Sequence, residues 1–457
     1  MSTYPSISFL SYSICMKPDI IVPIILGPTK MKCFKQFAPF IIFVLFSLSI
    51  SGCATFNPRP IEEGAFLERA QTKSDGKVTV TAAVVSRGES KELFGIDLAK
   101  KDIQPIWLEI ENNDSVPYLF MQSHLDPYYY SPSEVAFINR STFSPSMNRE
   151  MEEHFRGIGM YDYIEPGMAV SGFAYVHYEP GSRTVNITLL GPRRTKWFHF
   201  FFKATDMQLD YHTVDFYALY KEEEVTSVDE KALIKALEDL PCCATIKDGT
   251  VDGDPLNLVF IGDAEDIHAS LIRSGWDETE TLTTGSGLKT TGSFLFGGRY
   301  RYSPISPLYV FGRPQDAAFQ KARGTIHERN HFRLWITPMI FEGKNVWVGQ
   351  ISRDIGVKFT TKSWTLTTHV IDPDVDNDRW YLIQDLMNAE GIKKIGFVSG
   401  VGETSPDEHR TNHLGDRYFT DGLRAVLFFS DKPISYTEID FLDWEYPPAV
   451  KDYLRQW

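Results

Sequence analysis

Two histidines and two aspartates in the C-terminal half of the sequence are the residues best suited to catalysis. They are His331, Asp354, His369 and Asp372. Imidazoles beside carboxylates can act as a general base with its orienting partner, and the same residue types also ligate metals. We predict that these four side chains converge at one end of a β-sheet. The residue types alone leave any metal or other cofactor unknown.

Four further charged residues lie near these candidates in the sequence, and we predict that they bind a ligand. They are Arg313, Asp316, Arg333 and Arg353. A structural explanation competes, because Arg313 with Asp316, and Arg353 with Asp354, could form buried ion pairs that only position the chain. Asp374 and Asp376 have a similar alternative, since they precede a predicted helix, where an N-cap and an acidic first turn are favourable.

Residues His327–His331 spell the H-E-x-x-H motif of zinc peptidases. That chemistry needs both histidines on one face of a helix, where residues i and i+4 are neighbours. Here Gly324 ends the preceding segment, and the apolar residues Phe332, Leu334 and Ile336 recur at every second position, as in a β-strand. His331 is therefore predicted at the start of a strand, and a zinc peptidase is not favoured.

The charge of the chain argues against nucleic acid as a partner. It carries 46 Lys and Arg against 60 Asp and Glu, a net charge of −14, and no clustered basic tract. With 43% hydrophobic and 23% charged residues, the composition is that of a globular protein. An acidic protein is also repelled by anionic lipid, so attachment to a membrane must have a source other than a polybasic patch.

A secretory signal near the N-terminus supplies such an attachment. Residues 31–53, MKCFKQFAPFIIFVLFSLSISGC, have two lysines, an apolar run and small residues before a cysteine. The ending Ile50-Ser51-Gly52-Cys53 resembles a bacterial lipobox, which implies export, cleavage before Cys53 and modification of that cysteine with a lipid such as palmitate. Met31 is the better start codon, and Ala54 favours the periplasmic face of the outer membrane over the inner one. An ordinary signal peptide or a short transmembrane helix is the alternative.

The rest of the chain is predicted to be multidomain, with an immunoglobulin-like β-sandwich followed by an α+β domain with a mixed sheet. The predicted boundaries are 1–52 for upstream residues and the signal peptide, 53–75 for the lipidated cysteine and a tether, 76–222 for the β-sandwich, 223–254 for a helix and linker, 255–432 for the α+β domain and 433–457 for a tail. Cys242 and Cys243 fall in the linker. Adjacent Cα atoms are about 3.8 Å apart, below the range of roughly 4.4 to 6.8 Å usual for a disulfide, so we expect unpaired thiols, with a redox or metal role as the alternative.

Periodicity predicts the elements of the α+β domain. Apolar residues at helical spacing indicate helices over 263–276 and 313–324, and a cap signal indicates a third from about 377 to 391. Short apolar or alternating runs indicate strands over 256–262, 306–312, 331–340, 345–356, 392–400 and 423–430. Strands 331–340 and 345–356 are predicted to pair as a hairpin, which would place His331 and Asp354 on neighbouring strands.

Five blocks of this region resemble the LssY C-terminal domain family. They are SPLYVFGRPQDAAFQKA at 306–322, HFRLW at 331–335, VWVGQISRD at 346–354, THVIDPDVD at 368–376 and GDRYFTDG at 415–422. The resemblance implies no assigned activity. Longer members carry this domain beside membrane-embedded segments that include a phosphatase-like one, but here Phe359 stands where that phosphatase motif requires a histidine after Ser352-Arg353.

Two functions follow from these observations. The first is an exported, lipid-anchored protein of the cell envelope whose LssY-like domain binds a lipid, glycan or protein partner at the membrane surface. The second is a periplasmic hydrolase that acts on an envelope lipid or glycan through the His/Asp residues. The two differ in geometry, because the hydrolase requires His331, His369 and Asp354 or Asp372 to lie within a few ångströms of one another around an open pocket.

Overall fold

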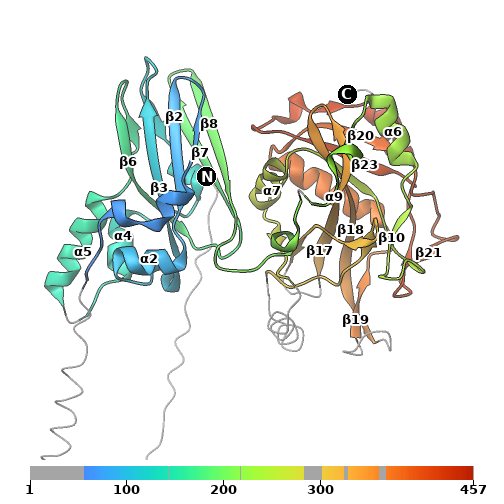
Figure 1. Cartoon of the computed structure of the whole chain (residues 1–457), viewed down its shortest axis with the longest axis horizontal. Helices are drawn as coiled ribbons and strands as arrows, with labels where there is room; N and C mark the ends of the chain where they lie inside the picture. Colours follow the sequence, from blue (N-terminus) through green and yellow to red (C-terminus); the bar gives the residue numbers. More distant parts are fainter. Residues whose placement is uncertain are drawn as a thin grey trace, which may run out of the picture. The chain divides into compact units, whose positions relative to one another are not determined.

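The computed structural model describes residues 56–142, 144–216, 218–281, 301–323, 328–359 and 367–455 (Figure 1). The predicted signal peptide and Cys53 lie outside these residues, as does His327 of the H-E-x-x-H sequence. Among the helices of the described residues, none is long and apolar enough to cross a membrane.

Two four-stranded antiparallel sheets make up the N-terminal β-rich part. The first has the order β1 (Gln71–Ser74), β2 (Val78–Val84), β3 (Ile103–Asn112), β6 (Ala169–His177), and the second has the order β5 (Tyr163–Ile164), β4 (Tyr118–Phe120), β7 (Arg183–Gly191), β8 (Arg194–Phe202). Alternate residues of both sheets, such as Val80, Leu108, Ile187 and Phe200, fill one shared core. The β-rich character predicted for this region is confirmed.

A layer of helices covers the first sheet, which the predicted β-sandwich did not include. These helices are α2 (Arg87–Phe94), α4 (Pro132–Ile138) and α5 (Pro145–Gly157), whereas α3 (Gln122–Leu125) contacts β7 of the second sheet. Figure 1 shows α2, α4 and α5 beside this sheet, and Phe94, Val135 and Phe155 from these helices pack against Ile103 and Phe173 of the sheet. Each helix is short and inserted between strands, so its apolar positions are too few to stand out against the β pattern.

The folded part also begins earlier than the predicted tether allowed. Residues Ile61–Glu63 and Ala65–Arg69 form 3-10 helices, β1 follows, and Phe66 is completely buried between the helical layer and the sheet. The tether expected over 53–75 is therefore wrong for its second half. Proline and polar composition suggested a linker, but a single aromatic side chain is enough to dock a short segment on a core.

A ten-stranded mixed sheet is the framework of the C-terminal part. Its order is β13 (Asp277–Glu278), β16 (Ala317–Ala322), β17 (Arg329–Phe341), β18 (Lys344–Phe359), β12 (Leu258–Ile261), β23 (Arg424–Phe429), β20 (Ile392–Val398), β24 (Asp440–Phe441), with β19 (Thr367–Ile371) paired to β18 and β9 (Thr226–Ser227) paired to β17. The pairs β12–β23, β20–β24 and β9–β17 are parallel and the others antiparallel. The mixed sheet and the hairpin β17–β18 confirm the predictions.

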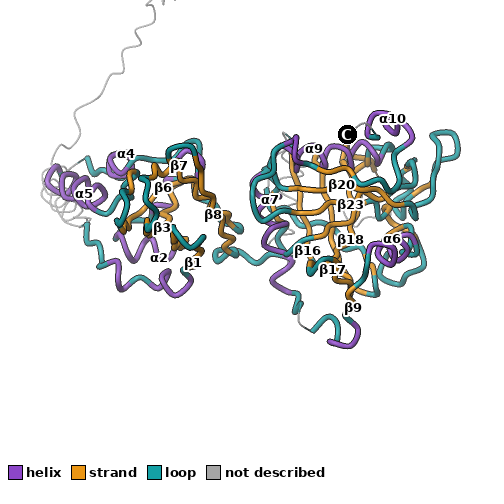
Figure 2. The backbone as a smooth tube through the Cα atoms, turned by 90° about the horizontal axis from the view of Figure 1, so that it is seen from above, coloured by secondary structure: helices purple, strands orange, loops and turns teal. Residues whose placement is uncertain are grey.

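Both faces of this sheet are covered, so the domain has three layers. Helices α7 (Ala264–Arg273) and α9 (Val375–Asn388) pack on one face, and α6 (Glu230–Glu238) packs on the other (Figure 2). Beside α6 lies a small sheet of the order β11 (Asp252–Pro255), β10 (Cys243–Thr245), β14 (Tyr309–Val310), β15 (Arg313–Pro314). The hairpin β21 (Arg410–Thr411) and β22 (Arg417–Tyr418) and helix α10 (Lys451–Leu454) complete the regular elements named here.

The helix predicted over 313–324 is wrong, because this segment forms β15 and β16. Its sequence has good helix formers, but β16 is hydrogen-bonded between β13 and β17. In this strand the side chains point alternately to the two faces of the sheet, and Phe319 packs in the core beneath α7 and α9. Tertiary pairing therefore overrides local propensity here.

Residues outside the predicted boundaries of the α+β domain also pack on its sheet. Leu209 and Tyr211, assigned to the β-sandwich, pack in the core of the C-terminal sheet. Helix α6 of the predicted linker covers that sheet, and β24 of the predicted tail extends it. The C-terminal domain is thus larger than the predicted range of 255–432.

Candidate functional site

Alternation along β17 and β18 sorts their polar residues onto two faces of the sheet. Phe332 and Ile351 face α7 and α9, whereas Trp335 and Val348 face α6. In a strand, residues two apart lie on the same face. Residues at 329, 331 and 333 of β17 and at 350, 352 and 354 of β18 therefore share the α6 side, and together they form a buried polar cluster.

His331 lies at the centre of this cluster, between a serine and an aspartate. It is directly opposite Ser352 in the β17–β18 register, and its Nε2 is 3.3 Å from Ser352 Oγ. On the other side of the ring, Nδ1 is 3.6 Å from Oδ2 of Asp354. A hydroxyl, an imidazole and a carboxylate in this order are the parts of a Ser-His-Asp triad.

Asp354 receives two more positively polarised groups on the same oxygen. Nδ1 of His369, on β19, is 3.6 Å from Oδ2, and Nε of Arg329 is 3.1 Å from it. A guanidinium at this oxygen competes with a metal ion for the carboxylate. The ion pair with Arg329 therefore disfavours a metal ion at Asp354.

Further hydrogen bonds join the cluster to β11 through Gln350 and Asp254. Gln350 donates from Nε2 to Ser352 Oγ at 2.8 Å and to Asp254 Oδ2 at 3.3 Å, and it accepts from Arg333 NH1 at 2.7 Å. Asn412 donates to the other oxygen of Asp254 at 2.8 Å. The side chains around Ser352 are thus held by residues from four separate segments.

Burial perturbs the ionisation of the cluster. Exposed fractions are 0% for Ser352, 3% for Asp354 and 6% for His331. Burial raises the pKa of the Asp354 carboxyl to about 7, although Arg329 acts to lower it. Burial, with the nearby Arg333 and Arg329, holds the pKa of His331 well below its usual value. His331 is therefore a neutral base at physiological pH, and strongly shifted groups in one cluster are typical of functional sites.

The structure thus brings three of the four predicted catalytic residues together and leaves out Asp372. Asp372 contacts Arg353, with Oδ2 at 3.9 Å from NH1, on the side of the sheet that faces α9. Arg353 also forms an ion pair with the buried Asp378, with Nε 3.1 Å from Oδ1. Asp372 was predicted to lie near Asp354. Adjacent residues of a strand point to opposite faces, so Asp372, which contacts Arg353, lies on the other face from Asp354.

The other predicted binding residues make contacts within the fold. Arg313 and Asp316 form a two-bond ion pair at 3.0 and 2.8 Å, and Asp316 also accepts from the backbone of Ile336. Asp374 caps α9 by accepting from Asn377, while Asp376 accepts from Thr420 and Asp421. These contacts support the structural alternative for this group. Arg333 is the exception, since it belongs to the buried cluster.

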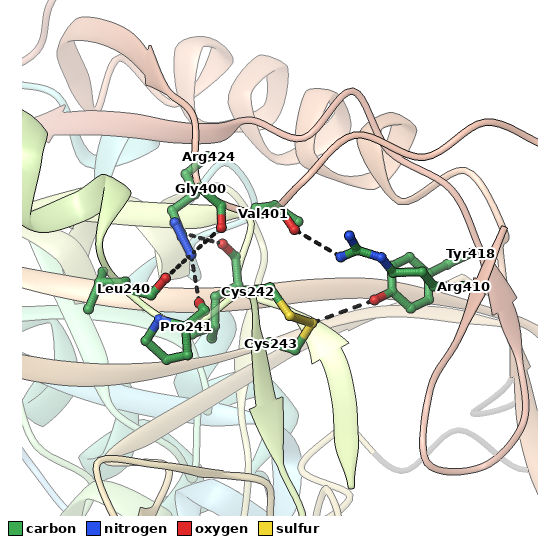
Figure 3. The surroundings of a disulfide bond; sticks show 10 residues. Leu240, Pro241, Cys242, Cys243, Gly400, Val401, Arg410, Tyr418 and Arg424 are labelled. Carbon is green, nitrogen blue, oxygen red and sulfur yellow. Dashed lines mark hydrogen bonds between the residues drawn. A yellow bond between two sulfur atoms is a disulfide. The ribbon is translucent and has the colours of Figure 1, made fainter. Parts of the chain in front are cut away.

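Cys242 and Cys243 form a disulfide, so the expectation of unpaired thiols is wrong (Figure 3). Their Cα atoms are 3.8 Å apart, the spacing of neighbouring residues. Among the described residues, one group of His, Cys, Asp or Glu has metal-ligand geometry: Cys242, Cys243 and Asp252, whose ligand atoms all lie within 4.8 Å of one another.

Sequence reasoning did not identify Ser352, Arg329 or Asp254 as members of the cluster. A signal for Ser352 was present, because the predicted hairpin places every second residue of β18 on one face, and Ser352 is two residues from Asp354. The exact register that sets Ser352 opposite His331 was not readable from the pattern. Asp254 carried no such signal, since β11 is in a different sheet.

Comparison with known families identifies the part of the chain that holds this cluster. Residues 234–423 match the model of a family described as LssY C-terminus. No curated protein matches the chain. The matched range includes the second half of α6, the β17–β18 hairpin, β19 and α9, and it contains every cluster residue named above. This C-terminal part of the chain belongs to the LssY C-terminus family.

Proposed function

We propose that the LssY C-terminus domain is a hydrolase that cleaves ester bonds with Ser352 as its nucleophile. The observation that carries this proposal is the position of one imidazole, His331, with Nε2 at 3.3 Å from the Ser352 hydroxyl and Nδ1 at 3.6 Å from Asp354. The sequence left binding and hydrolysis open. The approach of His331 and His369 to Asp354 meets the first of the two conditions for hydrolysis, convergence of the side chains, and the second condition is an open pocket.

Each residue has a role that its environment supports. Ser352 Oγ attacks the ester carbonyl while its proton passes to Nε2 of His331, and the alcohol leaves with that proton; water then releases the acyl group by the same route. His331 is neutral because burial lowers its pKa, so it is ready to accept the proton. Asp354 orients the ring through Nδ1, and Arg329 and His369 hold Asp354.

The proposed location of the protein limits the substrates that it can reach. The lipobox at residues 50–53 supports export and a lipid anchor on Cys53, which would hold the domain at an envelope membrane, with the periplasmic face of the outer membrane favoured by Ala54. A serine nucleophile acts on acyl groups. An acylated envelope lipid or an O-acylated glycan is therefore the proposed substrate.

The test is hydrolysis of short-chain p-nitrophenyl esters by the purified chain. Ser352→Ala and His331→Ala should each lower kcat/KM by about 10³-fold or more, the loss typical of a triad residue. Ser270→Ala is the matched control, because it removes an equally buried hydroxyl that donates to the backbone carbonyl of Asp266. Hydrolysis at the same rate by wild type and Ser352→Ala would contradict the proposal.

The second candidate is a non-catalytic domain that binds an envelope lipid, glycan or protein. Complete burial of Ser352, whose hydroxyl also accepts from Gln350 at 2.8 Å, favours it. On this account the cluster fixes the register of β17 and β18. Ser352→Ala would then lower the melting temperature, and the folded wild type would hydrolyse no ester.

A further inference from the structure

Cys242, Cys243 and Asp252 form a compact group of ligand atoms that is separate from the His331 cluster. Cys243 begins β10 and Cys242 directly precedes it, and Asp252 begins β11, the strand antiparallel to β10. Their sulfur and carboxylate atoms all lie within 4.8 Å of one another. In the structure the sulfurs are bonded to each other, so neither can act as a thiolate.

The surroundings of this group are fixed on one side and open on the other. Cys243 is buried, with Sγ 3.5 Å from the hydroxyl of Tyr418, whereas Cys242 is half-buried and Asp252 is exposed. Just before the cysteines, the guanidinium of Arg424 donates to the carbonyls of Leu240 and Pro241 at 3.2 and 2.6 Å (Figure 3). The backbone is thus held in place, while solvent reaches part of Cys242 and the carboxylate of Asp252.

We propose that reduction of the Cys242–Cys243 disulfide creates a Zn²⁺ site with Asp252 as the third protein ligand. A dithiol reductant supplies two electrons and two protons, cleaving the S–S bond and itself becoming a disulfide. Zn²⁺ then displaces the two thiol protons and bonds to both thiolates and to one carboxylate oxygen. Oxidation re-forms the S–S bond and releases the ion, so the site is controlled by redox state.

The donor set selects zinc. Two thiolates with one carboxylate match the sulfur and oxygen ligands that Zn²⁺ accepts in tetrahedral sites, with water in the fourth position. Cu(I) prefers sulfur donors alone, and Mg²⁺ and Ca²⁺ prefer oxygen alone. The carboxylate therefore disfavours Cu(I), and the two thiolates disfavour Mg²⁺ and Ca²⁺.

The test uses the full chain in which Cys15, Cys33 and Cys53 are all replaced by Ser, so that Cys242 and Cys243 are the remaining cysteines. Oxidised and reduced samples are loaded with Zn²⁺, freed of reductant and excess metal without air, and analysed by elemental mass spectrometry. One zinc per reduced chain and none per oxidised chain is expected. Equal zinc in both samples, or none in the reduced one, would overturn the proposal.

Variants then assign the ligands. Cys242→Ser/Cys243→Ser should retain no zinc, and Asp252→Asn should weaken binding by about tenfold or more in competition with a chromophoric chelator. Asp248→Asn is the control, because Asp248 is an exposed carboxylate of the same β10–β11 turn that bonds to Thr250. It should bind as tightly as the parent. Unchanged affinity in Asp252→Asn would exclude the three-ligand site.

Cobalt gives a readout that does not depend on the stability of the variants. Co²⁺ bound to the reduced chain should show a thiolate-to-metal charge-transfer band in the near ultraviolet, and the band should vanish on reoxidation. Co²⁺ bound without this band would mean that the sulfurs are not ligands, and the proposal would fail.

Discussion

Ser352 and His331 lie directly opposite each other on β18 and β17, with the serine hydroxyl 3.3 Å from Nε2 of the histidine. Cross-strand neighbours are the closest side-chain pairs in an antiparallel sheet, so this contact follows from the register of the hairpin. Asp354 is two residues from Ser352 on the same strand and therefore on the same face. One hairpin thus supplies the nucleophile, the base and the orienting carboxylate proposed for the site.

Replacing Asp354 should change how stability depends on pH. Its folded pKa is raised to about 7 from an ordinary value of 3.8, so the folded chain binds this proton more tightly than the unfolded chain does. The stability that this proton contributes is present below the unfolded pKa and is lost as the pH rises through about 7. Asp354→Asn removes that loss.

Thermal unfolding between about pH 4 and about pH 8 measures the effect. Across this range the melting temperature of the wild type should fall relative to that of Asp354→Asn. Parallel curves for the two proteins would show that the Asp354 carboxyl is not perturbed by folding.

Arg424 should be a major stabilising residue of the C-terminal domain. It is completely buried and donates to the carbonyls of Leu237, Leu240, Pro241, Leu256 and Gly400 at 2.6 to 3.3 Å. Arg424→Met should cost about 3 kcal/mol or more, because it leaves buried carbonyls unpaired.

Urea unfolding tests this cost against Arg156→Met. That control removes an exposed arginine whose ion pair with Glu152 lies on one helix, and it should cost less than about 1 kcal/mol. Equal losses in the two variants would mean that the Arg424 contacts do not stabilise the fold.

The proposed lipid anchor is tested by Cys53→Ser. Wild type should fractionate with membranes and incorporate labelled palmitate, whereas Cys53→Ser should do neither, because the modified thiol is lost. Cys33→Ser is a suitable control, since Cys33 lies in the signal before the proposed cleavage point. Membrane attachment and labelling that survive Cys53→Ser would rule out the anchor.

The sequence predicted those elements whose pattern is set by their own residues. Alternation revealed the β17–β18 hairpin, and the cap Asp374 marked the start of α9. Strand β16 was mistaken for a helix because its residues favour helix locally, and its pairing with β13 and β17 depends on distant segments. Local sequence pattern thus explains the correct predictions, and pairing with distant strands explains the error at β16.

The candidate site shows the same limit. His331, Asp354 and His369 were found by residue type, but Ser352 required the exact register and Asp372 required the correct face. The disulfide was rejected from the Cα spacing, and the structure nonetheless joins the neighbouring cysteines. Residue chemistry therefore identified candidates, and geometry was needed to select among them.

Covalent labelling by a fluorophosphonate probe tests the central claim most directly, because the probe reacts with a serine that a neighbouring base activates. Peptide mass spectrometry should find the probe on Ser352 of the wild type, and the label should be lost in His331→Ala and kept in Ser270→Ala. A folded wild-type chain that carries no label on Ser352, or a label that persists in His331→Ala, would contradict the proposed triad.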